Sequence, residues 1–168
     1  MLETLITSKT RLRLLVKFFV NIGNIGYLNS LANEFGESTN SVRKELNNLS
    51  SAGYLIKKNK NNKIIYNANT KHPLFKTIQQ IVRKHLGIEQ ILETIYNQVG
   101  DVEKVLLLGD YAKGIDGGTI EILVLGKKIN KSYLTQLKPK IEKKINRKVN
   151  FFFSRQMMNE KGLIIFEA

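Results

Sequence analysis

The pattern of apolar and polar positions over the first 73 residues predicts helices followed by a hairpin. Ser8 is a suitable N-cap for a first helix over residues 8–20. The positions of this helix that follow the 3.6-residue period toward a core are Leu12, Leu15, Val16 and Phe19. Residues 21–26 contain two glycines and predict a turn. A second, short helix is predicted over residues 28–35, with Gly36 as the residue that ends it.

A third helix is predicted over residues 38–51, with Ser38 as its cap and Gly53 after its end. The apolar stripe of this helix consists of Val42, Leu46 and Leu49. Two strand-like runs, 54–58 and 63–67, follow, and the polar stretch 59–62 joins them as a hairpin. This order of elements is that of a winged helix-turn-helix, so residues 1–73 are predicted to form a DNA-binding domain.

Helical spacing continues through residues 74–99, and Gly87 divides this stretch into two helices. We expect residues 74–100 to connect two domains, to form a dimer seam, or both, with Ile81, Ile88 and Ile95 as the residues to test. The chain has two histidines: His72 lies before Pro73 in a predicted turn, and His85 lies late on a predicted helix. Both are expected to be surface or capping residues.

From residue 101 the pattern changes to short apolar runs typical of buried strands. Strands are predicted over 105–108, 120–125, 149–153 and 163–166. A loop over 109–118 and a helix over 132–145, interrupted at Pro139, separate the first three of them. The predicted fold class is therefore α+β: a winged helix over 1–73, connecting helices over 74–100, and a small α/β domain with a mixed sheet over 101–168.

The charge balance of the chain indicates what class of partner it binds. Lys and Arg total 27 against 14 Asp and Glu, a net charge of +13. Residues 1–73 hold 11 of the basic and 4 of the acidic side chains and have the highest density of net positive charge. Such a surplus favours a polyanionic partner, either nucleic acid or an acidic membrane surface. A basic composition can also follow from the codon usage of AT-rich DNA.

Composition also excludes several kinds of chemistry. The chain contains no cysteine, which rules out disulfides, thiolate nucleophiles and cysteine-ligated metal sites. The apolar runs are far shorter than the ~20 residues that span a bilayer, and residues 2–20 show no secretory pattern. We therefore expect a cytoplasmic protein with no membrane partner, no metal and no cofactor.

The third helix and the hairpin together carry the residues expected to contact DNA. The buried stripe of that helix leaves its polar side chains outward, where Asn suits adenine and Arg suits guanine. The lysines of the hairpin suit phosphate contacts beside the recognition helix. The candidate DNA-binding residues are Ser38, Thr39, Asn40, Arg43, Lys44, Asn47, Lys57, Lys58, Lys60 and Lys63. The alternative is that these polar residues merely solvate one face of a small domain.

Residues 27–36, 38–49 and 52–55 resemble the winged-helix domain of arsenic-repressor-type regulators. The family pattern is "leu-x-x-leu-ala", a turn, a serine-capped recognition helix, then "leu-x-x-ala-gly-leu-leu", and this chain ends the last part with Ala52-Gly-Tyr-Leu55. The resemblance covers roughly residues 8–73 and implies a homodimer on a pseudo-palindromic operator in double-stranded DNA. Metal-sensing members of the family use cysteine pairs or histidine/carboxylate sets. Because this chain has no cysteine, metal sensing is not expected of it.

Residues 108–114, followed by 119–124, resemble the core of the minimal nucleotidyltransferases. Those enzymes have Gly-Ser-x-Ala-Arg-Gly, a spacer, Asp-x-Asp on a strand and a third carboxylate on a later strand. Their chemistry is metal-assisted nucleotidyl transfer. The positions of this chain that match the motif are Gly109, Asp110, Lys113, Gly114, Thr119, Glu121 and Asn150.

Most of the catalytic positions of that motif have changed. Asp110 stands where serine would contact phosphate, and Thr119 and Asn150 stand where carboxylates would bind metal. Glu121 is the one carboxylate kept, although Asp110 or Asp116 could partly compensate. We therefore expect a transcriptional regulator whose last domain is not an enzyme and has no catalytic residue. Two alternatives stay open: an antitoxin-type nucleotidyltransferase recruited to DNA, and a module whose last domain binds an unknown protein or nucleotide.

Overall fold

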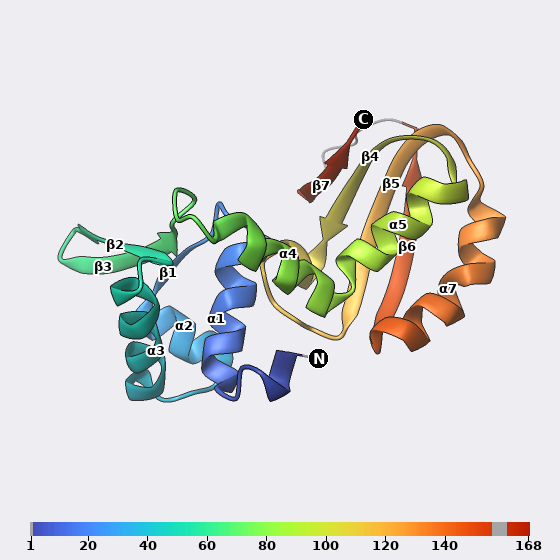
Figure 1. The fold of residues 1–168 in the computed structure, drawn as a ribbon. Coiled ribbons are helices and arrows are strands. Elements are labelled where there is room, and N and C mark those ends of the chain that lie inside the picture. The colour runs from blue at the N-terminus through green and yellow to red at the C-terminus, as the bar shows by residue number, and fades with distance from the viewer. Residues whose placement is uncertain (1, 156–160) are drawn as a thin grey trace. The chain divides into compact units, whose positions relative to one another are not determined.

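The computed structural model describes residues 2–155 and 161–168. The chain forms two compact units, Met1–His85 and Leu86–Ala168, which we call the N-terminal and C-terminal units (Figure 1). The N-terminal unit is helical with a small sheet, and the C-terminal unit is a mixed sheet with helices. The predicted α+β fold class is confirmed.

The N-terminal unit has the element order of a winged helix. Its elements are η1 (Leu2–Thr4), α1 (Lys9–Val20), β1 (Ile25–Tyr27), α2 (Leu28–Phe35), α3 (Thr39–Ser51), β2 (Leu55–Lys60), β3 (Lys63–Ala68) and α4 (Phe75–Leu86). The three strands form an antiparallel sheet in the order β1-β3-β2. The three predicted helices and the hairpin are all present.

Serine caps begin α1 and α3, as predicted. The Ser8 Oγ accepts a hydrogen bond from the Arg11 amide at 3.1 Å, and the Ser38 Oγ accepts one from the Ser41 amide at 3.2 Å. These bonds satisfy backbone donors that the first turn of a helix leaves without partners. Behind the caps, both helices bury their apolar faces. The face of α1 is wider than predicted: Leu14 and Phe18 are fully buried, whereas Leu12 is only partly buried.

The strand β1 was not predicted, because residues 21–26 were interpreted as a turn. Residues 25–27 pair antiparallel with β3, with Gly26 opposite Tyr66. Three residues are too few to show a two-residue alternation, and a glycine in a strand weakens the signal further. The glycine is needed for close packing: a Cβ at Gly26 would lie 2.9 Å from the Leu31 Cδ1 and 3.0 Å from the Phe18 ring.

The hairpin turn is tighter than the predicted loop over 59–62. The strands pair as far as Lys60 opposite Lys63, which leaves only Asn61 and Asn62 in the turn. Both asparagines have positive φ, 50° and 60°. This conformation is typical of a two-residue hairpin turn, and asparagine tolerates it better than most residues.

A buried carboxylate joins α1 to α3. Glu45 lies on α3 with its side chain 8% exposed. Its Oε1 accepts a hydrogen bond from the Ser8 Oγ at 2.8 Å, and its Oε2 accepts one from the Arg11 Nε at 2.8 Å. Burial raises the pKa of Glu45, but the hydrogen bonds from Arg11 and Ser8 outweigh it, so that the net pKa lies below its ordinary value.

The C-terminal unit is built on a four-stranded sheet in the order β6-β5-β4-β7. Its elements are α5 (Ile88–Gln98), β4 (Gly100–Leu108), α6 (Gly109–Ala112), β5 (Thr119–Ile129), α7 (Lys131–Ile145), β6 (Lys148–Ser154) and β7 (Leu163–Glu167). The strand β4 runs antiparallel to β5 and β7, while β5 and β6 are parallel. All four predicted strands are present, and the sheet is mixed, as expected.

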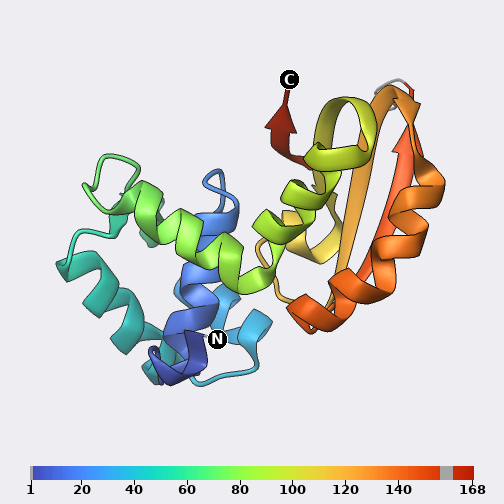
Figure 2. The same ribbon diagram turned by 45° about the vertical axis from the view of Figure 1, so that its right-hand side comes forward.

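Alternation along the strands separates the two faces of this sheet. On one face, Ile120, Ile122 and Val124 are fully buried. Helices α5 and α7 contact each other and pack against the sheet there (Figure 2). The opposite face carries Thr119 and Glu121 and then a small apolar cluster of Leu106, Leu123 and Leu125.

Helix α7 continues through Pro139, so the predicted interruption at this residue was wrong. Pro139 is exposed, and the apolar residues before and after it, Leu134 and Ile141, are both buried in one core. Burial of both halves of the helix outweighs the hydrogen bond that proline cannot donate.

The structure divides the predicted connecting segment 74–100 between the two units at His85. Two of the residues chosen for a dimer seam, Ile88 and Ile95, are 0% and 1% exposed in the core of the C-terminal unit, so that choice was wrong. Ile81 on α4 is 43% exposed.

The expectation of a surface or capping role was also wrong for His85, which is 7% exposed and accepts a 3.5 Å hydrogen bond from the Leu2 amide. His72 does have a local capping role, because its Nδ1 accepts a hydrogen bond from the Leu74 amide at 3.1 Å.

Within the described residues, every helix is too short or too polar to cross a lipid bilayer.

The Glu45 network generates a stability prediction. We expect Glu45→Gln to lower the free energy of unfolding by about 2 kcal/mol at pH 7, because it weakens two hydrogen bonds to a buried charge. A depressed pKa in the folded state contributes stability that is present above about pH 4.5 and is lost as the pH falls through the folded pKa. The difference between wild type and variant should therefore shrink below that pH.

Urea denaturation at several pH values measures this difference. The control is Glu34→Gln, which removes the surface ion pair with Lys17 (2.9 Å) and should cost no more than about 1 kcal/mol. Equal losses in the two variants would contradict a special role for Glu45.

Candidate nucleic-acid interface

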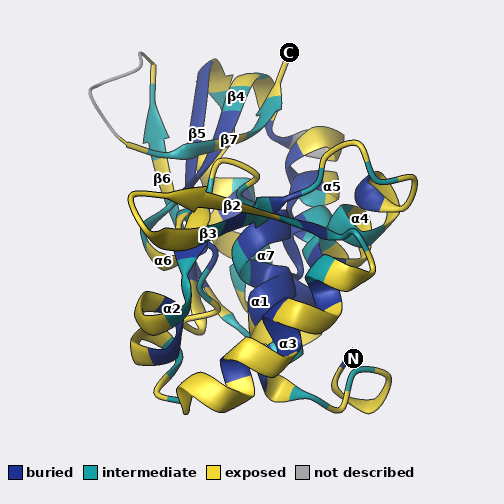
Figure 3. Ribbon diagram, turned by 90° about the vertical axis from the view of Figure 1, so that its left-hand side faces the viewer, coloured by how far each residue is buried: buried dark blue, intermediate teal, exposed yellow. Residues whose placement is uncertain are grey.

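The polar side chains predicted on α3 point away from the core. Val42, Leu46 and Leu49 are buried at 0%, 0% and 6% exposure. Every predicted contact residue of this helix and its cap is exposed: Ser38, Thr39, Asn40, Arg43, Lys44 and Asn47. Exposed residues also run along the β2–β3 hairpin (Figure 3).

A groove of about 790 Å³ lies between α3, the start of α2 and the hairpin. Four of the predicted residues line it: Arg43, Asn47, Lys60 and Lys63. No carboxylate lines it among the described residues, so its three cations face a hollow without acidic neighbours in its wall. A groove with this charge suits a phosphate backbone and the base edges beside it.

The remaining hairpin lysines lie outside the groove. Lys57 pairs with Tyr66 and Lys58 with Ile65, so the two lysines lie on opposite faces of the hairpin. The sequence alone predicted one group of four hairpin lysines, but the β2–β3 register places Lys57 and Lys58 on opposite faces, and only Lys60 and Lys63 line the groove.

The groove also contains residues that the sequence analysis missed. Tyr27, Asn29 and Ser30 line it from β1 and the start of α2, and Asn61 and Tyr66 line it from the hairpin. Burial raises the pKa of Tyr66 above its ordinary value of 10, while the nearby Arg43 cation opposes that shift. The exposed polar pair Asn29-Ser30 at a helix start was the only signal available. Tyr66 gave none, because an aromatic residue in a strand is most simply a core residue.

Arg43 is held in place by its own helix. Its Nη1 donates a hydrogen bond to the Asn40 Oδ1 at 2.8 Å, one turn earlier on α3. Two side chains suited to bases are thus fixed relative to each other before any partner binds, which lowers the entropy lost on binding.

In the C-terminal unit, strand register brings the nucleotidyltransferase-like positions together. Glu121 on β5 lies opposite Leu108 on β4 and Asn150 on β6. Gly109 has a φ of +56°, and a Cβ there would lie 2.2 Å from the Glu121 Oε2. The glycine therefore lets the Glu121 carboxylate approach the turn.

The donors at this site do not fit a divalent metal. Glu121 has the neutral Asn150 beside it and the neutral Thr119 two residues earlier on the same face of β5. Mg²⁺ prefers carboxylate oxygens, and the described residues contain no cluster of three His, Cys, Asp or Glu that could hold a metal. A cation already lies near this position: the Lys138 Nζ donates to the Asn150 Oδ1 at 3.3 Å.

The carboxylates that could have compensated have other surroundings. Asp116 forms a bidentate ion pair with Arg147, at 2.9 Å to the Nε and 2.6 Å to the Nη2, and also accepts a hydrogen bond from the Tyr111 hydroxyl. Burial and the Asp116 carboxylate raise the pKa of Tyr111 well above its ordinary value of 10. Asp110 is exposed at the start of α6.

The other motif residues complete the turn. Gly114 has a φ of +73°, and its amide donates to the Tyr111 carbonyl at 3.1 Å. Lys113 is the exposed C-cap of α6 and replaces the arginine of the family pattern.

No family model and no curated protein matches the chain. Among solved structures, the toxin–antitoxin MntA-HpeT in a mutant form is 16% identical, with a TM-score of 0.41, over 48% of this chain and 73% of that one. The DNA-binding protein Sso10a-2 from Sulfolobus solfataricus is 19% identical, with a TM-score of 0.35, over 50% and 90%. The transcriptional regulator BldR from the same organism is 12% identical, with a TM-score of 0.40, over 58% and 70%. At these values the likenesses assign neither a family nor a function.

Proposed function

We propose that the chain is a sequence-specific, DNA-binding transcriptional regulator of the arsenic-repressor type. The observation that supports this function is the groove in which Arg43 and Asn47 of α3 meet Lys60 and Lys63 of the hairpin, with no carboxylate in the described wall. In such a regulator α3 enters the major groove, and the hairpin contacts the adjacent backbone.

The residues divide by the part of DNA they suit. Asn40, Arg43 and Asn47 are exposed on one helix and have the side chains that pair with adenine and guanine edges. Lys60 and Lys63 at the end of the hairpin suit phosphates, as do Asn29 and Ser30 at the start of α2. The cysteine-based metal sensing of the family is not part of this proposal, since the chain has no cysteine.

The regulator acts as a homodimer in this proposal. One winged helix covers one half-site, and a symmetric operator needs two. An apolar stripe along α4 and the residue before it is available for this contact: Leu74, just before the helix, is 48% exposed, Ile81 is 43% exposed, and Ile78 between them is partly buried.

The C-terminal unit is a pseudoenzyme in this proposal. Its fold keeps the turn at Gly109, but Glu121 is the only carboxylate at the three expected metal positions. The ammonium of Lys138 beside Asn150 and the ion pair between Asp116 and Arg147 both oppose assembly of a metal site.

The regulator proposal is tested by selecting DNA sequences from a genomic library with the full chain. Arg43→Ala should weaken binding to the selected sequence by about 1–3 kcal/mol and relax the choice of base. Lys63→Ala should weaken binding to all sequences alike and reduce the salt slope by about one unit, because it removes one phosphate contact.

The matched control is Lys71→Ala, an exposed lysine of the same unit that does not line the groove. It should leave both the affinity and the salt slope near wild type. If no sequence is preferred over bulk DNA, sequence-specific regulation is the wrong function.

Dimerisation is tested by sedimentation of the purified chain. Ile81→Glu places a charge in the proposed apolar contact and should shift the chain to a monomer, with at least a tenfold loss of affinity for a two-half-site operator. Ile22→Glu changes an equally exposed isoleucine that lies outside α4 and should remain dimeric. A wild-type monomer at micromolar concentration, bound one chain per site, contradicts this part of the proposal.

The pseudoenzyme proposal predicts no labelled product when the chain is incubated with labelled nucleoside triphosphates, Mg²⁺ or Mn²⁺, and candidate acceptors. Neutral oxygens at Thr119 and Asn150 bind these ions weakly, and the charge of Asp110 repels the incoming phosphates. Product that disappears in the Glu121→Gln variant would show that the C-terminal unit is an enzyme after all.

A further inference from the structure

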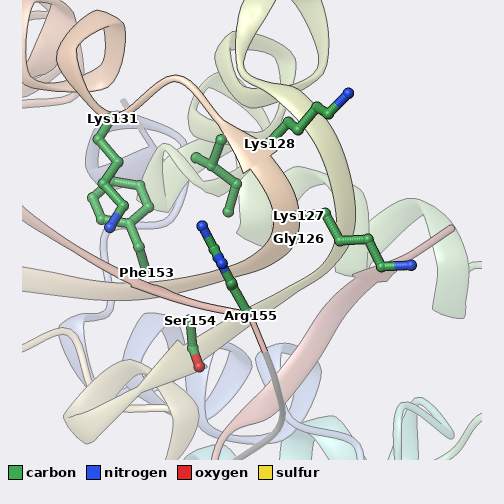
Figure 4. A pocket seen from close by; sticks show the side chains of 8 residues that line it. Gly126, Lys127, Lys128, Lys131, Phe153, Ser154 and Arg155 are labelled. Carbon is green, nitrogen blue, oxygen red and sulfur yellow. The ribbon is translucent and has the colours of Figure 1, made fainter.

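A second basic hollow lies in the C-terminal unit, where β5 and β6 end and α7 begins. Its volume is about 350 Å³. The side chains in its wall that bear on its chemistry are Lys127, Lys128, Lys131, Phe153, Ser154 and Arg155 (Figure 4). It is separate from the nucleotidyltransferase-like turn, because Glu121 and Lys127 are six residues apart on one strand, about 20 Å at 3.3 Å per residue.

Strand direction places this hollow. Because β5 and β6 are parallel, their carboxyl ends meet at one edge of the sheet, the position at which α/β sheets usually bind ligands. The Asn130 Oδ1 accepts the Tyr133 amide at 3.1 Å and caps α7 immediately after β5, so the positive end of the α7 dipole lies at the same edge.

A bulge shapes the strand that forms the wall. The pairing of β4 with β5 shifts register between Gly100 and Val102 and again between Val102 and Lys104. Gly126, in the wall, faces this irregularity, and a Cβ there would lie 2.1 Å from the Asp101 carbonyl oxygen. Bulges are enriched beside functional sites because they redirect side chains.

The charges in the wall are all positive. Arg155 extends into the middle of the hollow, whereas the amines of Lys127 and Lys128 extend outward from the wall (Figure 4). The Lys131 Nζ lies 5.4 Å from the centre of the Phe153 ring. Lys127 has a carboxylate 3.8 Å away, that of Glu103, but no carboxylate of the described residues forms an ion pair with Lys128, Lys131 or Arg155.

We propose that this hollow binds a small ligand with linked phosphate groups, such as an inorganic or nucleoside triphosphate. The wall carries four cations, of which only Lys127 has a carboxylate beside it, and a ligand of three or four negative charges offsets the repulsion among them. The planar guanidinium of Arg155 matches two phosphate oxygens at once, and the lysines add point charges on flexible stems. The volume lies within the range of small-molecule sites.

Titration calorimetry on the full chain tests this site, with inorganic triphosphate and ATP as probes in separate arms. We expect saturable binding with one ligand per chain, and an affinity that falls steeply as salt rises. Similar affinities for the two probes indicate recognition of the phosphates alone, and tighter ATP binding indicates a nucleotide ligand; both support the site.

The variant Lys131→Ala/Arg155→Ala should lose at least about tenfold in affinity, because it removes two charge-assisted contacts. The control Lys140→Ala/Lys143→Ala removes the same charge from exposed positions of α7 that do not line the hollow, and it should bind as wild type does. Thermal unfolding of each variant separates loss of the site from loss of the fold.

The proposal is overturned by the absence of saturable triphosphate binding at millimolar concentration, or by equal losses in the two variants. It is also overturned if the Lys131/Arg155 change leaves triphosphate binding intact but weakens binding of duplex DNA, because the hollow would then belong to a DNA-contacting surface.

Discussion

The position of α3 depends on one buried carboxylate. Glu45 lies one turn from Val42 and Leu49 on the inner face of this helix, and both of its oxygens accept hydrogen bonds from α1 or its cap. The charge of a buried carboxylate is stable only while its hydrogen-bond partners, here Ser8 and Arg11, compensate for the lost contact with water. The network therefore constrains how α3 lies against α1, and with it the direction in which Asn40, Arg43 and Asn47 point.

Close packing of the small sheet against the helices determines that the candidate interface is a groove and not a flat charged surface. Gly26 lets β1 come close to Phe18 and Leu31. The strand β1 pairs with β3, and Tyr66 on β3 lines the groove together with Arg43 and Asn47 of α3. Each step depends on close packing in the N-terminal unit. The cations on α3 and at the hairpin tip therefore come to face a common hollow, although Arg43 and Lys60 are 17 positions apart in the sequence.

The parallel pairing of β5 with β6 has the equivalent role in the C-terminal unit. At one end it sets Glu121 beside Asn150, where a family of enzymes would have two carboxylates. At the other end it brings the ends of both strands beside the start of α7. The first end carries the Glu121 carboxylate beside neutral side chains, and the wall of the hollow at the second end carries four cations. In our proposal this unit binds phosphates at the second end.

By itself, the sequence determined the longer helices, the serine caps of α1 and α3, the hairpin and the strands of the larger sheet, because these follow from spacing along the chain; the short helix α6, in the stretch 109–118 predicted as a loop, did not follow from it. The stripe Val42, Leu46 and Leu49 needed only the helical period, and it correctly left Arg43 and Asn47 outward. Strand register, by contrast, is invisible to local pattern. It decided that Lys57 and Lys58 lie on opposite faces of the hairpin and that Tyr66 reaches the groove. Tertiary packing likewise decided that Ile88, Ile95 and His85 are buried and that α7 runs through Pro139. The local spacing of residues determines which face of a helix or strand is apolar, but only tertiary packing determines which residues that face contacts.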